Sequence, residues 1–187
     1  DLIELCTDWR VHRRIRAHRD QVCENVRVKL LPRDYRREPA ELSPEKAIEG
    51  ASRLALALLV TRRTTIRHNA AADVAPQEAA LEPSIILSDW KPDERKALLE
   101  RPLFTFASYG RVRFHHRSVT EYLAARRLQD WRGRGMSFTA LKRLLSAETR
   151  GRIIVRPSMR PVAGWLALGE RGIFELLRDH EPAVLAA

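Results

Sequence analysis

The residues best suited to chemistry lie together at the end of a short strand pattern, where His115 and His116 precede Ser118 and Glu121. Ser118 and Glu121 have the spacing of a capping box, in which the serine side chain accepts from the N–H of the glutamate and the glutamate accepts from the N–H of the serine. This spacing predicts a helix that begins at Val119. It leaves His116 beside the free N–H groups of the first turn, which favour anions such as phosphate.

An apolar face must hold these residues in place. The strand pattern ends at Phe114, and Tyr122 and Leu123 belong to an apolar stripe on the following helix. We expect Phe114, Tyr122 and Leu123 to form the structural core of this unit. Because successive side chains of a strand point to opposite faces, we expect His115 to be structural or solvent-facing and His116 to be the residue that meets a ligand.

The pattern Phe-x-His-x-x-x-x-Glu-Tyr-Leu-Ala-Ala, which begins here at Phe114, resembles the winged-helix segment of NACHT-type STAND NTPases. It is most similar to the bacterial members used in antiphage defence. The likeness is strongest over residues 88–134, with Thr120 where the family often has Gln. Residues 1–10 resemble the end of the family's nucleotide-binding core, and residues 165–167 resemble the helical array that follows the winged helix.

The resemblance implies that His116 contacts the phosphates of bound ADP and holds a closed, inactive state, supported by Arg117, Ser118 and Glu121. It implies ADP or ATP with Mg²⁺ as cofactor, bound mainly by the protein's own nucleotide-binding domain. It also implies homo-oligomerisation on activation and a phage protein as the trigger, acting through downstream repeats. The expected role is therefore a regulatory lid and winged-helix module of a signalling ATPase in antiviral defence.

Two helix patterns precede this segment. Apolar residues at roughly helical spacing predict a helix over residues 12–31, followed by a charged linker over 32–42. Ser43 and Pro44 then give an N-cap and a proline at the first helical position. The apolar repeat that follows predicts one long helix to about Ile66.

A β-hairpin is predicted over residues 104–114, because apolar and polar residues alternate on both sides of a turn at 108–110. A short helix pattern over 93–100 precedes the hairpin. Further helices are expected around Leu141 and over residues 158–168 and 172–187, in a pair of the kind that stacks in arrays.

The sequence thus predicts a mainly α fold in four parts. These are a helical segment ending the nucleotide-binding module (1–42), a helical lid and loop (43–87), a winged-helix domain with one small β-hairpin (88–136), and the start of a repeat-like helical array (137–187).

Catalytic motifs are absent from the sequence. Gly164 and Gly169 have the separation found in a phosphate-binding loop, but Glu170 and Arg171 stand where Lys and then Ser or Thr are required. There is also no Gly-x-Ser-x-Gly or His-Glu-x-x-His motif. We therefore expect no catalytic residue here. We expect the chain to be a fragment, preceded in the full-length ATPase by the phosphate-binding Lys and the Mg²⁺-binding Asp.

Composition and residue spacing argue against a metal site, a disulfide framework and a membrane span. Cys6 and Cys23 lack metal-binding or disulfide spacing, and the other histidines are scattered, so no metal site is expected. The longest uncharged apolar run, residues 54–60, is far shorter than the roughly 20 residues that span a bilayer. A cytoplasmic protein without a membrane span is therefore expected.

Two alternatives stay open. The formal charge of +10 is compatible with a winged helix that binds nucleic acid. The arginines that would contact phosphates in that case are Arg111, Arg113, Arg126, Arg127 and Arg132. The densest basic stretch, residues 10–19, suits phosphates or an acidic partner. The other alternative is a helical scaffold without a ligand of its own.

Overall fold

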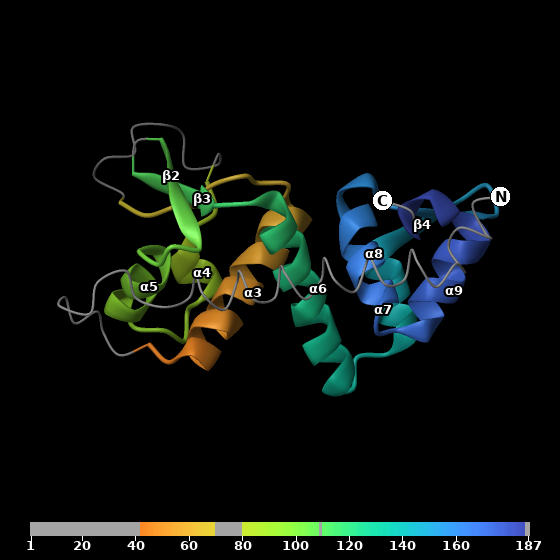
Figure 1. The fold of residues 1–187 in the computed structure, drawn as a ribbon, viewed down its shortest axis with the longest axis horizontal. Helices are drawn as coiled ribbons and strands as arrows, with labels where there is room; N and C mark the ends of the chain where they lie inside the picture. The colour runs from red at the N-terminus through yellow and green to blue at the C-terminus, as the bar shows by residue number, and fades with distance from the viewer. Residues whose placement is uncertain (1–41, 70–79, 109, 186–187) are drawn as a thin grey trace, which may run out of the picture. The chain divides into compact units, whose positions relative to one another are not determined.

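The computed structural model of the protein describes residues 42–69, 80–108 and 110–185. The helix predicted over residues 12–31 and the middle of the loop after residue 69 lie outside these residues. The described chain is mainly α-helical with two small antiparallel sheets, as the sequence predicts (Figure 1). It divides into two compact units, and the division falls within one helix between Ala124 and Ala125. We call residues 42–124 the first unit and residues 125–185 the second unit.

The first unit contains, in chain order, a helix, a strand, two helices, two strands and the first half of a further helix. Its elements are α3 (Pro44–Thr61), β1 (Ile66–Arg67), α4 (Pro83–Ile86), α5 (Pro92–Leu99), β2 (Phe104–Ser108), β3 (Arg111–Phe114) and the first half of α6 (Arg117–Gly133). The strands form one antiparallel sheet in the order β1-β3-β2. The hairpin that the sequence predicts is therefore confirmed, and β1 is added to it from outside the predicted winged-helix range.

Helix α3 begins as predicted but ends early. The Oγ atom of Ser43 accepts from the N–H of Lys46 at 3.2 Å, so Ser43 caps the helix and Pro44 opens it. The helix ends because Arg62 takes a left-handed conformation with φ of 56° and donates its N–H to the carbonyl of Leu58. The predicted continuation to Ile66 is wrong, since Ile66 lies in β1 opposite Val112. Left-handed caps favour glycine, so an arginine at this position gives no sequence signal.

One packed core joins α3 to the segment before α5. Gly50 lies under the Trp90 ring so closely that an added Cβ atom would be 2.4 Å from Trp90 Cη2. Trp90 is buried, and a guanidinium N–H of Arg101 donates to the carbonyl of Leu42 at 3.0 Å. Residues 43–87 and 88–124 therefore belong to the same compact unit, and the predicted boundary at residue 88 runs through its core.

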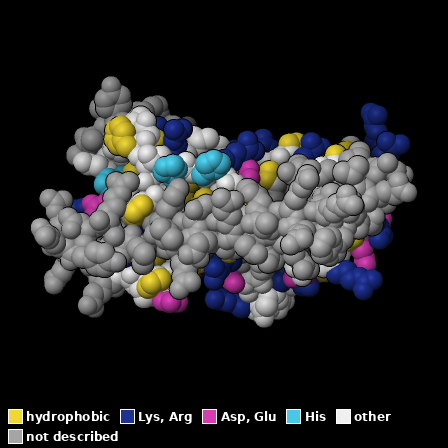
Figure 2. All heavy atoms as spheres, in the orientation of Figure 1, with side chains coloured by type: hydrophobic (Ala, Val, Ile, Leu, Met, Phe, Trp, Pro, Cys, Tyr) yellow, Lys and Arg dark blue, Asp and Glu magenta, His cyan; other side chains and the backbone are white. Residues whose placement is uncertain are grey.

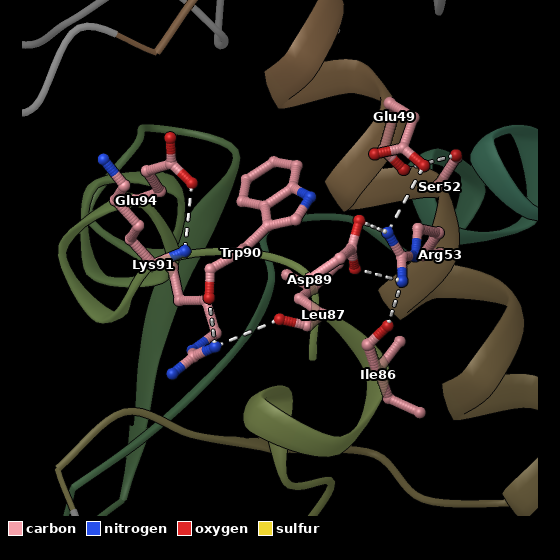
Figure 3. A network of polar contacts seen from close by, with 10 residues as sticks. Glu49, Ser52, Arg53, Ile86, Leu87, Asp89, Trp90, Lys91 and Glu94 are labelled. Carbon is pink, nitrogen blue, oxygen red and sulfur yellow. Dashed lines mark hydrogen bonds and ion pairs between the residues drawn. The ribbon is translucent and has the colours of Figure 1, made fainter.

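Polar contacts reinforce this core (Figure 3). The Arg53 guanidinium on α3 donates to both carboxylate oxygens of Asp89, at 2.9 and 2.7 Å, and to the carbonyl of Ile86 at 2.6 Å. The hydrogen bond from Arg53 lowers the pKa of Asp89 below its usual range. Nearby, the ammonium of Lys46 lies 2.6 Å from Glu94 and 5.0 Å from the centre of the Trp90 ring.

The second unit contains the predicted helices and a hairpin that we did not expect from the sequence. Its elements after α6 are α7 (Phe138–Leu145), β4 (Ser146–Thr149), β5 (Arg152–Val155), a 3₁₀ turn η2 (Pro157–Met159), α8 (Arg160–Ala167), α9 (Arg171–His180) and a final 3₁₀ turn η3 (Pro182–Leu185). The predicted helix pair corresponds to α8 and α9. Helix α9 stops at His180 rather than continuing to residue 187. Throughout the described ranges, no helix has both the length and the apolar character needed to cross a membrane.

Candidate functional site

The predicted site lies between β3 and α6, where His115 and His116 connect the strand to the helix. The backbone N–H of His115 donates to the carbonyl of Leu103 at 2.9 Å, which extends the antiparallel contact past the end of β3. The side chains of His115 and His116 are both exposed. Figure 2 shows histidine side chains on the visible face of the protein, near Lys and Arg side chains.

Helix α6 begins at Arg117, two residues before the predicted start, so the predicted capping box is not formed. Ser118 is the second helical residue and does not occupy the N-cap position. The Glu121 carboxylate instead accepts from Nε of Arg117 at 2.8 Å, one helical turn earlier. The spacing of Ser118 and Glu121 predicts a helix that begins at Val119, but the helix already includes the residues before it, because Thr120 donates its N–H to the carbonyl of His116 at 3.4 Å.

The Ser118 side chain has a different partner from the one predicted. Its Oγ lies 2.9 Å from Nδ1 of His116, so the serine orients the imidazole ring. When the hydroxyl donates to Nδ1, the other ring nitrogen, Nε2, carries the hydrogen and can donate to an anion. A serine two residues after a histidine is the sequence signal that could have indicated this contact.

Several hydrogen-bond donors therefore meet at the start of α6. The imidazole of His116, the N–H groups of the first helical turn and the Arg117 guanidinium, whose side chain is 79% exposed, all lie at this end. Arginine uses only Nε for its bond to Glu121, which leaves its two NH₂ groups for other acceptors. This arrangement of donors suits a phosphate group.

Glu121 is the acidic residue of the site, and it is buried. Burial raises the pKa of its carboxyl, while the hydrogen bond from Arg117 and the nearby Arg117 and His116 charges act in the opposite direction. Burial has the larger effect. The buried carboxylate therefore holds Arg117 from within the unit, rather than presenting a negative charge to solvent beside His116.

The residues predicted to form the core behave unequally. Phe114 and Leu123 are buried, with 6% and 0% of their surface exposed, and Phe114 packs on Phe104 with a ring-centre distance of 4.6 Å. Tyr122 is only half-buried, so the expectation that it is a fully buried core residue is wrong. The helical stripe is centred on Val119 and Leu123, and Tyr122 lies at its margin.

The five arginines considered for nucleic acid have different environments. Arg111 is buried, Arg127 lies over the ring of Trp131 at 5.5 Å, and Arg132 donates to the carbonyl of Met136 and lies 3.7 Å from Glu170. Of the five, Arg113 is exposed and Arg126 half-buried. Helix α5, which would be the DNA-reading helix of a winged helix, carries Asp93 and Glu94 in its first turn and Arg95 and Lys96 directly after them. Its net charge is therefore zero, and it gives no basic surface for phosphates.

The described residues contain no cluster of three or more His, Cys, Asp or Glu side chains that could hold a metal ion. The arrangement at the start of α6 is thus a set of hydrogen-bond donors around an oriented imidazole. Comparison of the chain with protein-family models, with curated proteins and with solved structures finds no match.

Proposed function

We propose that this protein is the regulatory part of a NACHT-type signalling ATPase of antiviral, antiphage defence, and that His116 reads the phosphates of ADP. The observation that carries the proposal is the exposed His116 ring, oriented by Ser118 and placed at the first turn of α6. The resemblance of the segment that begins at Phe114 to the family's winged helix supplies the identity of the ligand. The ADP itself, with Mg²⁺, would be held mainly by the nucleotide-binding domain of the same protein.

In this mechanism, the first unit closes over ADP in the inactive state. His116 and the N-terminus of α6 contact the phosphates only in the closed form, so ADP favours that form through its greater affinity for it. One hydrogen bond to a charged group contributes about 1.5–3 kcal/mol, which biases the equilibrium roughly ten- to hundredfold. Loss of this contact on exchange for ATP would free the core to form a homo-oligomer.

The trigger and the setting belong to the same proposal. The second unit would form the beginning of a helical array that receives a phage protein, and the protein would act in the cytoplasm. The helix pair α8 and α9 supports this role because such pairs stack in repeat arrays.

The experiment compares ADP release from full-length His116→Ala, His115→Ala and parent proteins, using a fluorescent ADP analogue. We expect His116→Ala to release ADP about ten- to hundredfold faster and to oligomerise without a trigger. His115→Ala is the matched control, since it also removes an exposed histidine side chain, one residue earlier in the chain. Ser118→Ala should accelerate release by a smaller factor, because it frees the ring without removing it. A lower melting temperature with unchanged ADP release in His116→Ala would refute the proposed function.

A further inference from the structure

Helix α7, the β4–β5 hairpin and the residue after it form a segment of the second unit in which basic side chains outnumber acidic ones. Residues 138–156 contain five basic side chains against one acidic side chain, a net charge of +4. Four of the five are exposed arginines. Among the described residues, none of these four forms an ion pair with an acidic side chain: Arg143, Arg150, Arg152 and Arg156.

Elsewhere in the second unit, arginines form ion pairs with acidic side chains. In the segment after the hairpin, each carboxylate side chain is paired with an arginine. The pairs are Arg132–Glu170, Arg171–Glu175, Arg178–Asp179 and Arg160–Glu181. The arginines without an acidic partner among the described residues are therefore not a consequence of a general absence of acidic residues. Arg150 and Arg152 belong to the hairpin, whereas Arg143 lies on α7 and Arg156 directly follows β5.

The tip of the hairpin has a conformation that its sequence does not favour. Arg150 and Gly151 form the two-residue loop, with φ of 52° and 73°. Two positive φ angles in such a loop favour Asn or Asp followed by Gly. An arginine at the first position is strained, and strain of this kind is concentrated at functional sites. The chain thus places an exposed arginine at the tip against its backbone preference.

The two faces of the hairpin differ in exposure. Thr149 pairs with Arg152 and Ala147 with Ile154, and because strand residues alternate, these four share one exposed face. Glu148, the acidic residue of the hairpin, pairs with Ile153 on the other face. Arg152 and Glu148, the charged residues of the two strands, therefore lie on opposite faces.

The base of the hairpin is fixed while its tip is exposed. The N–H of Val155 donates to the Glu181 carboxylate at 2.7 Å, and the N–H of Arg156 donates to the carbonyl of Leu145 at 2.8 Å. These bonds tie β5 to the helices behind it.

We propose that the β4–β5 hairpin binds double-stranded DNA, with Arg150 at the groove and Arg143, Arg152 and Arg156 on the phosphates. A two-stranded ribbon fits the major groove of B-form DNA, which is about 12 Å wide. Guanidinium groups match phosphate oxygens in pairs. This site is separate from the winged-helix arginines considered above and does not depend on the role of His116.

The test measures fluorescence anisotropy of a labelled 20-base-pair DNA duplex on titration with the full 187-residue chain. Three phosphate contacts predict a log–log salt slope of about −2.7, so affinity should fall roughly fortyfold between 50 and 200 mM salt. An RNA duplex should bind more weakly, since its narrow major groove does not admit the ribbon. Equal or tighter binding of RNA, or competition by polyglutamate as effective as that by DNA, would overturn the proposal.

Three variants locate the contact. Arg150→Gly removes the tip charge while supplying the residue that the loop conformation favours, so it should weaken binding roughly five- to tenfold without lowering the melting temperature. Arg152→Gln should weaken binding by a similar factor and provides a second test away from the loop. Arg171→Gln, which removes an exposed arginine of α9 paired with Glu175, is the control and should leave binding unchanged. Binding absent at 50 mM salt, or equally weakened by Arg171→Gln, would refute the site.

Discussion

The second strands of the two β-hairpins begin with similar residues, but the first arginine of each strand differs in burial. Gly110 and Gly151 both have positive φ, at 68° and 73°, and each is followed by an arginine and a β-branched residue. In the first hairpin Arg111 is buried, while in the second Arg152 is exposed. Both turns thus contain a glycine of positive φ before the arginine, but this local sequence does not decide what the arginine does.

The difference comes from what each sheet packs against. In the first unit, β3 lies between β1 and β2, and its aromatic and β-branched residues enter the core. In the second unit, β4 and β5 form a two-stranded sheet with one solvent-facing side. A strand in the middle of a sheet is covered on both edges, whereas a lone hairpin keeps its charges available to a partner.

Truncating the aromatic core of the first hairpin should have the largest effect. Phe114→Ala should destabilise the protein by about 3–5 kcal/mol, because Phe114 is 6% exposed and stacks on Phe104. The measurement is the free energy of unfolding in urea. Phe106→Ala, on the same hairpin but 71% exposed, should change it by less than about 0.5 kcal/mol. Similar losses for both variants would show that burial does not distinguish the two rings.

The second prediction compares a tight glycine in each unit. Gly50→Ala should cost about 1–3 kcal/mol, since its Cβ would lie 2.4 Å from the buried Trp90 ring. Gly172→Ala should cost less, because Phe138, at 2.8 Å from the added atom, is only half-buried and has room to move. Thermal denaturation of both variants provides the comparison. A greater loss of stability for Gly172→Ala than for Gly50→Ala would contradict the expectation that Phe138 moves aside more easily than Trp90.

Ser137 caps a helix and Ser118 does not, so their substitution should affect stability differently. Ser137 accepts from the N–H of Ala140 at 3.1 Å, so Ser137→Ala should cost about 1 kcal/mol. Ser118 lies inside α6 and contacts His116 instead, so Ser118→Ala should affect stability less than it affects ADP release. Equal destabilisation by the two substitutions, measured by chemical unfolding, would restore Ser118 as a cap.

Replacement of Arg150 at the tip of the second hairpin by glycine, which the backbone conformation there favours, should raise stability. Relief of a left-handed arginine offers about 1–2 kcal/mol, and the added backbone freedom of glycine returns about 0.5–1 kcal/mol. Arg150→Gly should therefore stabilise the second unit by about 0.5–1 kcal/mol. Differential scanning calorimetry measures the change. A destabilised variant would mean that the arginine makes contacts that outweigh its strain.

The smallest effect concerns Glu121 and depends on pH. Burial raises its pKa above the ordinary value of 4.5, so ionisation destabilises the folded state, and stability falls as pH rises through the raised pKa. Glu121→Gln should thus slightly raise the melting temperature at pH 7 and have no such effect well below pH 4.5. A lower melting temperature at pH 7 would show that the Arg117 contact outweighs burial.

Local patterns were sufficient to predict much of the fold. Ser43 and Pro44 marked the start of α3, alternation marked β2 and β3, and apolar spacing marked α7 to α9. Phe114 and Leu123 were correctly expected in the core. Each of these features depends on neighbouring residues in the chain, so the sequence itself contains the information.

Other features required the tertiary structure. The end of α3 at Arg62, the missed strands β4 and β5 and the partner of Ser118 all depend on contacts or backbone conformations that their residue types do not favour or specify. The sequence alone determined that arginines and histidines lie near turns and helix starts. Only packing decided that Arg111 is buried and Arg152 exposed, because burial depends on which distant segments cover a strand.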